Sequence, residues 1–195
     1  MSSSNLLKGI VTGIAGTLFA TAALASDAHV APMTDFAQST VKQWISNPTV
    51  VEAVKAQNAK HAGISQADID AMDKDWRAQT DAGSKPMIDA ILGNALSNFL
   101  RQQQEAAGGL VTEVFVMDNR GLNVGQSDVT SDYWQGDEAK WQKTFQGGAD
   151  AIFVDEVEMD ESTQTFQSQV SMSIVDPATG EVIGAITVGV NVDAL

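Results

Sequence analysis

The segment TFQSQVSMSIVDPATGEVIGAITVGVNV, residues 165–192, decides the fold. Apolar and polar side chains alternate along its two halves, and this period of two predicts strands over 165–175 and 181–192. The five residues 176–180 between them, DPATG, are a turn signal. Because strands joined by so short a turn must lie side by side in opposite directions, the segment predicts an antiparallel pair.

The alternation gives the two faces of this pair different characters. One face carries the larger apolar side chains, which are Phe166, Val170, Met172, Ile174, Val182, Ile186, Val188, Val190 and Val192. The other carries mainly small or polar side chains, which are Gln167, Gln169, Ser171, Ser173, Ile183, Ala185, Thr187, Gly189 and Asn191. We expect helices to cover the first face, whereas the second either leaves space for a ligand or meets water.

Three more strands are expected upstream, over 110–117, 122–126 and 151–159, with a tight turn at 118–121. A connection of about 25 residues, which is long for a compact domain, joins the second of these strands to the third. It contains the segment 131–141, SDYWQGDEAKW, and a helical turn is expected over 140–146. Since its rings need burial and the small, polar face needs cover, we predict a cavity between this insertion and the sheet.

The first half of the chain reads as helices. Apolar residues recur at helical spacing from Thr34, and Asn47-Pro48 is a helix start signal, so a second helix is expected from Pro48 to about Ala62. A single helix kinked at Pro48 is the alternative. Ser65 to Asp68 resembles a capping box. The clearest apolar stripe runs from Met87 to Leu100 after Pro86 and before Gly108, and we expect it to lie against the sheet.

Composition narrows the function. The chain has 195 residues, 44% hydrophobic, with a net charge of −14, which fits one domain and argues against binding nucleic acid or anionic lipid. There is no cysteine, and the two histidines, His29 and His61, lie in different segments, so no metal site and no cofactor are expected. His29 is expected in a loose terminus, and His61 as a solvated or capping side chain. Nucleophile-elbow, phosphate-loop and zinc-protease motifs are absent, so we expect no enzyme.

Residues 1–25 have the layout of an export signal. Lys8 precedes an uncharged run, and Ala23-Leu24-Ala25 offers small residues for cleavage after Ala25. The alternative is an uncleaved anchor over residues 9–26, at the short limit for a membrane span. Both place the folded part outside the cytoplasmic membrane, in the periplasm. The expected plan is a signal peptide (1–25), a helical region (26–109) and a sheet with its insertion (110–195).

The order of these elements resembles the extracytoplasmic, PAS-like sensor domains called Cache domains, in single-module form. The resemblance rests on the Asp118-Asn119-Arg120-Gly121 hairpin, the Tyr133-Trp134 insertion and the closing pair around the turn DPATGEVIGAI, residues 176–186. It covers roughly 33–195. It implies an α+β fold in which long N-terminal helices pack on a five-stranded antiparallel sheet, and a small metabolite bound between sheet and insertion.

The resemblance also implies a ligand class and a partner. Tyr133, Trp134 and Trp141 fall where the family has aromatic pocket walls, and Asp155 falls where amine-binding members keep a carboxylate. The insertion lacks an arginine to clamp a ligand carboxylate, and Lys140 is a partial substitute, so an amine or other small cation is favoured. The expected partner is a membrane receptor or histidine kinase. The expected ligand-binding residues are Tyr133, Trp134, Trp141, Asp155, Phe153, Phe115, Met117, Gln169, Ser171 and Ser173.

Structural roles compete with these assignments. The Tyr-Trp pair is as well explained as a hydrophobic plug, or as a protein contact in an accessory protein. Asp118 is expected to stabilise its hairpin turn. Acids near the start of the insertion's helix, namely Asp132, Asp137 and Glu138, are expected to cap it. The acids Glu156, Glu158, Asp160 and Glu161 read as a solvated edge.

Overall fold

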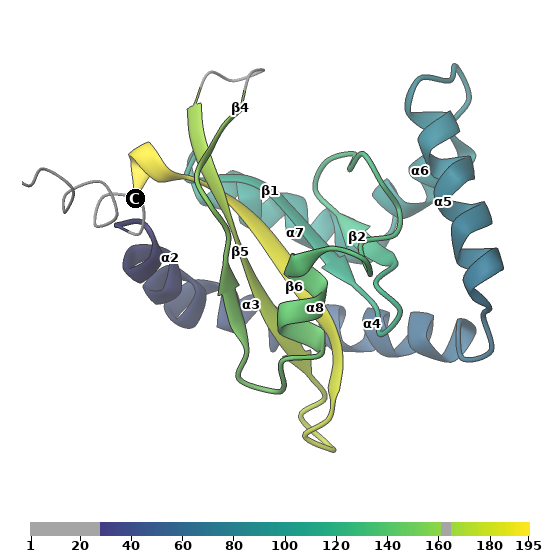
Figure 1. Ribbon diagram of the computed structural model, residues 1–195, viewed down its shortest axis with the longest axis horizontal. Helices are drawn as coiled ribbons and strands as arrows, with labels where there is room; N and C mark the ends of the chain where they lie inside the picture. Colours follow the sequence, from purple (N-terminus) through teal and green to yellow (C-terminus); the bar gives the residue numbers. More distant parts are fainter. Residues whose placement is uncertain (1–27, 161–164) are drawn as a thin grey trace, which may run out of the picture.

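The computed structural model describes residues 28–160 and 165–195 (Figure 1). The expected export signal, 1–25, and Glu161 lie outside these residues. Within the described part of the chain, no helix is both long enough and apolar enough to cross a membrane.

The N-terminal helix contains a π-helical turn. It begins as α2 (Val30–Phe36), passes through η1 (Ala37–Val41) and ends as α3 (Lys42–Ile45). A new helix, α4 (Pro48–Lys60), then starts at Asn47, whose extended backbone (φ −69°, ψ 134°) breaks the run. The Asn47 side chain accepts a hydrogen bond from Thr49 N. Two helices, and not one kinked helix, therefore flank Pro48, as the cap residue indicates.

Three further helices follow. The predicted capping box at Ser65 is confirmed at the start of α5 (Gln66–Thr80). The apolar stripe after Pro86 is divided between α6 (Pro86–Leu92) and α7 (Ala95–Ala106), because Asn94 is extended and caps α7 through Ser97 N. The expectation that the whole stripe faces the sheet is wrong. Ile88 packs with α5, whereas Leu96 and Leu100 join the core beneath the sheet.

The strands form one antiparallel sheet in the order β2-β1-β6-β5-β3, with β4 also paired to β5. These strands are β1 (Val111–Met117), β2 (Asn123–Gln126), β3 (Ile152–Val154), β4 (Glu158–Asp160), β5 (Thr165–Val175) and β6 (Val182–Asn191), with a short 3-10 turn, η2 (Val192–Ala194), after β6. The expected third strand, 151–159, is thus two short strands along β5. The predicted α+β class and the antiparallel pairing are confirmed.

Each face of the sheet has its own cover. Val170, Ile186 and Val188 belong to the main core, which they share with Met33, Val54 and other residues of the N-terminal helices and α7. On the opposite face lies α8 (Ala139–Phe145), from the insertion, in front of β5 and β6 in Figure 1. The predicted division of the sheet into an apolar, helix-covered face and a small, polar face is confirmed.

Two side chains depart from the predicted alternation. The β5–β6 register shifts between Ile174 and Val175, and this bulge turns Ile183 toward the main core and not toward the polar face. Phe166 is 49% exposed, because its part of β5 extends with β4 beyond the helices, where it pairs with Met159.

Candidate functional site

Helix α5 holds the first part of the insertion in place. The Trp76 indole stacks on the Tyr133 ring, with centroids 5.5 Å apart, and its Nε1 donates to Thr130 O. Asp73 Oδ1 accepts hydrogen bonds from Tyr133 N (2.9 Å) and Trp134 N (3.0 Å). Tyr133 is consequently only 4% exposed, and burial raises the pKa of its hydroxyl.

Two acids of the insertion, Asp132 and Glu138, form ion pairs with an arginine and a lysine. Arg77 bridges Asp73 (2.7 Å) and Asp132 (2.8 Å), and Lys140 pairs with Glu138 at 2.9 Å. Glu138 is the N-cap residue of α8, but its side chain makes no capping hydrogen bond. Glu138 thus has the predicted position at the start of the insertion's helix, but its carboxylate pairs with Lys140 and makes no capping hydrogen bond.

The polar face beneath α8 is filled. Trp141 packs on Phe115, Met117 and Ala185, and its ring stacks on Phe145 at 4.8 Å. The hydroxyls that were expected to floor a cavity have partners in the protein. Ser171 Oγ lies 2.9 Å from Thr187 Oγ1, and Ser173 Oγ lies within hydrogen-bond distance of the carbonyl oxygens of Thr144 and Gly148.

A hollow of about 230 Å³ opens beside this filled region, between the start of α8 and the β3 side of β5. Carboxylates dominate its lining. The lining residues are Glu138, Lys140, Asp155, Glu156, Glu158, Gln167, Ser168 and Gln169. We call it the acidic hollow. Four carboxylates face one ammonium group in this lining. Glu156 and Glu158, two of the acids expected to form a solvated edge, are exposed and also border the hollow, together with the predicted Asp155 and Gln169.

The main chain of Asp155 is fixed by three hydrogen bonds. Its N–H donates to Gln169 O (2.9 Å), and its carbonyl oxygen accepts from Ser168 Oγ (2.8 Å) and His29 Nε2 (2.9 Å). The carboxylate itself accepts only from Glu156 N among the described residues. It is therefore held at the hollow without a cationic partner. His29, at 8% exposure, is not in a loose terminus as expected, because this contact anchors it.

Two other polar residues that line the hollow, Gln169 and Lys140, are oriented by contacts with neighbouring side chains. Gln169 Nε2 donates to Glu113 Oε1 at 2.8 Å, which leaves the amide oxygen of Gln169 to accept from a ligand. Lys140 Nζ lies 5.5 Å from the centre of the Phe115 ring, and only 14% of the side chain is exposed. A neighbouring pair, Lys143 above Phe153 at 4.1 Å, repeats this arrangement one turn further along α8.

Three other hollows differ in chemistry. One of about 650 Å³ lies between the N-terminal helix and the β3 edge, with Lys42 and Asp150 as its ionised groups. One of about 590 Å³ between α4 and α7 is mainly apolar. A third, of about 210 Å³, includes Trp134 and Trp141. The largest volume does not mark the best candidate, because specificity comes from polar groups that converge on a site, and the acidic hollow has most of these.

The ten expected ligand residues are thus divided among several places. Asp155 and Gln169 line the acidic hollow, Trp134 and Trp141 line the 210 Å³ hollow, and Ser173 borders the 650 Å³ hollow. Tyr133, Phe115, Met117 and Ser171 are buried in packing contacts, and Phe153 is half-buried under Lys143. The prediction of one cavity walled by all three rings is wrong, because Tyr133 faces α5. Their contact with a ligand stays a prediction.

Asp118 joins the β1–β2 turn to α4 and α8. Its Oδ1 accepts from Arg120 N and Leu122 N, which confirms the predicted role in the turn. Its Oδ2 lies 3.0 Å from His61 Nδ1 and accepts from Gln57 Nε2. His61 ends α4 at 5% exposure, so it is a buried partner of Asp118 and not a solvated side chain.

Comparisons with known proteins show similarity of structure alone. No protein-family model matches the sequence, and no curated protein matches it significantly. A Vibrio cholerae histidine kinase DctB sensor domain is 14% identical with a TM-score of 0.38, covering 74% of this chain and 57% of its own. The ligand-binding domain of the Campylobacter jejuni chemoreceptor Tlp3, in complex with 4-methylisoleucine, is 13% identical with a TM-score of 0.38, covering 80% and 62%.

The ligand-binding domain of the Pseudomonas aeruginosa amino acid chemoreceptor PctC, in complex with GABA, is 13% identical with a TM-score of 0.37, covering 62% of this chain and 50% of its own. This chain therefore spans between half and about three fifths of these solved domains. One of the three is the sensor domain of a histidine kinase, and two are ligand-binding domains of chemoreceptors. At such identities and TM-scores the likeness assigns neither a ligand nor a role to this chain.

Proposed function

We propose that this chain is a periplasmic sensor module of the Cache type, which binds a small cationic metabolite in the acidic hollow and passes occupancy to a membrane receptor or histidine kinase. The observation that carries the proposal is the excess of carboxylates around a concave site of about 230 Å³. Its smallness, below the ~300–1,000 Å³ of drug-sized sites, favours a ligand of few heavy atoms.

An amine fits the groups that line this hollow. The Asp155 carboxylate has no cationic partner in the described part of the chain, and the Gln169 amide oxygen is free to accept. An ammonium group donates three hydrogen bonds and would find both acceptors. Lys140 already satisfies Glu138, so its ammonium group adds little repulsion. An anionic ligand would instead meet an excess of like charge.

Asp155 also connects the acidic hollow to the N-terminal helix, and this connection gives a route for the signal. Because His29 donates to Asp155 O, the ligand-facing residue is hydrogen-bonded to the start of the N-terminal helix. A bound cation that shifts Asp155 changes this contact, and a ligand moves an equilibrium only through such differences between states. The π-helical turn, η1, lies in this helix, and such turns occur frequently at functional sites.

Thermal denaturation with a panel of ligands tests the proposal. We expect diaminobutane and other short amines to raise the melting temperature, since a ligand at a hundred times its dissociation constant stabilises the protein by about 2.7 kcal/mol. Matched carboxylates and alcohols should have no effect. Asp155→Asn should weaken amine binding about tenfold or more, as expected for loss of a charge-assisted hydrogen bond.

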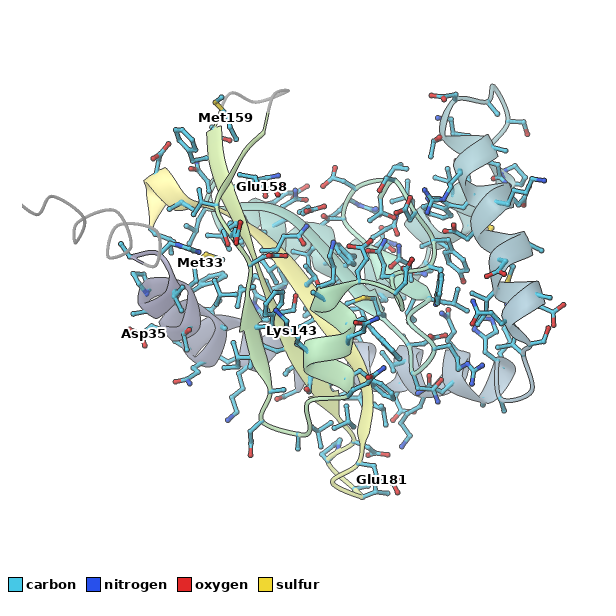
Figure 2. The ribbon with its side chains drawn as sticks, viewed as in Figure 1. Met33, Asp35, Lys143, Glu158, Met159 and Glu181 are labelled. Atoms are coloured by element: carbon cyan, nitrogen blue, oxygen red, sulfur yellow. The ribbon has the colours of Figure 1, made fainter. Side chains whose placement is uncertain are left out.

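A matched pair of variants distinguishes binding at the acidic hollow from a general effect of the protein's negative charge. Glu158 borders the acidic hollow on β4, and Glu181 lies at the opposite end of the molecule in Figure 2. Glu158→Gln and Glu181→Gln remove the same charge, and only the first should weaken binding. Equal effects of the two, or an amine response that Asp155→Asn leaves unchanged, would count against the acidic hollow.

The alternative function, a protein contact through the Tyr-Trp segment, has less support. Tyr133 is 4% exposed and stacks on Trp76, so it offers no surface to a partner. No observation on the described residues favours that alternative.

A further inference from the structure

A second small hollow, of about 210 Å³, is lined by aromatic and neutral groups with one arginine. It lies where the β1–β2 turn, the insertion and the first turn of α5 meet. The lining residues are Gln66, Ile69, Asn119, Arg120, Trp134, Gly136 and Trp141. In contrast to the acidic hollow, its lining contains no carboxylate, although the chain has 25 acids and 11 bases.

Both indoles are oriented by the same turn. Trp134 Nε1 donates to Arg120 O (2.9 Å), and Trp141 Nε1 donates to Asp118 O (3.0 Å). Each ring therefore uses its only hydrogen-bond donor on the protein and can offer a ligand only its carbon surface. Rings held in this way bind flat, apolar groups without losing further rotational freedom.

The backbone of this region is also fixed by close contact. A Cβ at Gly121 would lie 2.5 Å from Gly136 Cα, and a Cβ at Gly136 would lie 2.4 Å from Trp134 Nε1. Gln135 N donates to Gly121 O at 2.7 Å. Because the insertion rests directly on the turn, the hollow is already formed in the absence of a ligand.

Arg120 brings a positive charge to this hollow. Arg77, Lys55 and Lys140 all pair with carboxylates, whereas Arg120 makes no ion pair with any residue in 28–160 or 165–195. The guanidinium donates a long hydrogen bond, 3.4 Å from Nη2 to Ile64 O. The exposed guanidinium thus keeps its planar set of donors, which matches a carboxylate. The Asn119 side chain beside it also makes no hydrogen bond with the described residues.

We propose that this hollow is a second ligand site, which takes a small carboxylate with a flat, apolar body. The indoles of Trp134 and Trp141 contact the body, and Arg120 pairs with the carboxylate. The site differs from the acidic hollow in place and in charge, so the two take ligands of opposite charge. A ligand bound here contacts the insertion and the β1–β2 turn. Its binding does not require Asp155.

The test is a titration of the purified protein with benzoate, followed by calorimetry and by the NMR signals of the indole groups. We expect saturable binding in the range of about 0.1–10 mM, with shifts at Trp134 and Trp141 and not at Trp44 or Trp76. Benzyl alcohol, which has the ring without the charge, and acetate, which has the charge without the ring, should each bind about tenfold more weakly or worse. Benzylamine should not compete with benzoate.

Two substitutions that each replace a cation by glutamine provide the decisive comparison. Arg120→Gln should weaken benzoate about tenfold or more while leaving the melting temperature nearly unchanged, because Arg120 is exposed. Lys74→Gln removes the same charge from an exposed position of α5 outside the hollow and should have no effect on benzoate. Asp155→Asn should also leave benzoate affinity unchanged, so a failure of the amine proposal is distinguishable from a failure of this one.

Several outcomes would overturn the second site. These are equal affinity for benzoate and benzyl alcohol, an Arg120→Gln variant that binds benzoate like the parent protein, and indole shifts confined to Trp44 or Trp76. The absence of any saturable response to benzoate would overturn it as well.

Discussion

At Gly136 a single added methyl group would collide with the indole of Trp134. Gly136→Ala places its Cβ 2.4 Å from Trp134 Nε1, where the ring donates to Arg120 O. We expect the variant to lose about 1–3 kcal/mol of stability through overpacking. Chemical denaturation measures this loss. In Gly83→Ala the new methyl group meets no atom within 4 Å, so its cost should be near zero. Equal stability of the two variants would contradict the close packing of the insertion.

Ionisation of the Tyr133 hydroxyl should cause part of the loss of stability at alkaline pH. Burial, and secondarily Asp118, raise the pKa of its hydroxyl above the ordinary 10.0. The neutral form is therefore favoured by folding. This contribution is present below pH 10, and it is lost as pH rises above 10 toward the folded-state value. Tyr133→Phe should flatten the fall in unfolding free energy above pH 10. Since Tyr133 is the only tyrosine, a fall of unchanged slope in the variant would show that other groups cause it.

Individual residues also show where a sequence is an incomplete guide. The alternation along residues 165–192 gave the correct side for Val170, Ile186 and Ser171, because a strand leaves only two directions for a side chain. It misplaced Ile183, since a bulge reverses the direction and has no reliable local signal. The position of Asp155 at a site follows from the family resemblance, whereas no local signal shows that the exposed Glu156 and Glu158 border a hollow, because that hollow depends on α8.

At the scale of elements, the N-terminal helix and β3 are joined through His29. His29→Ala removes the hydrogen bond to Asp155 O, which still accepts from Ser168 Oγ, so amine affinity should change little. We expect amine binding to slow amide hydrogen exchange in residues 30–45 of the parent protein, and this protection should be lost in the variant. Ser39→Ala, which alters only local contacts of the same helix, should keep it. Protection that survives in His29→Ala would exclude this route.

The packing of α5 is the element-scale feature that sequence patterns missed. Its apolar residues Ile69 and Trp76 are buried. Their partner, however, is the insertion and not the apolar face of the sheet. A periodic stripe identifies which side of a helix is buried but not what buries it. For this reason the sequence predicted a lid over a cavity, whereas Tyr133 packs on Trp76 and Trp141 fills the space below α8.

At the scale of the whole molecule, acid stability should depend on a link between α4 and the β5–β6 turn. Lys55 Nζ lies 2.9 Å from Asp176 Oδ2, and Ala178 N also donates to this carboxylate. The hydrogen bond from Lys55, and then that from Ala178, lower the pKa of Asp176 below 3.8. A depressed carboxyl pKa stabilises the fold above the unfolded-state value, and this stability is lost as pH falls below 3.8 through the folded-state value.

Asp176→Asn should therefore flatten the acid limb of the stability curve and lower stability at neutral pH. Urea denaturation over a series of pH values measures both. Asp35→Asn, at an exposed position without an ion pair among the described residues, is the matched control and should leave the acid limb unchanged. If both variants keep the acid limb of the parent protein, Asp176 does not contribute to it.

The composition of the whole chain agrees with the chemistry of the acidic hollow, since a net charge of −14 attracts cations from a distance. The most direct test of the central proposal is a set of ¹H–¹⁵N NMR spectra recorded during titration with diaminobutane. We predict saturable shifts centred on Lys140, Asp155 and Gln169, which are lost in Asp155→Asn. Spectra that stay unchanged, or shifts centred away from the acidic hollow, would contradict the proposal.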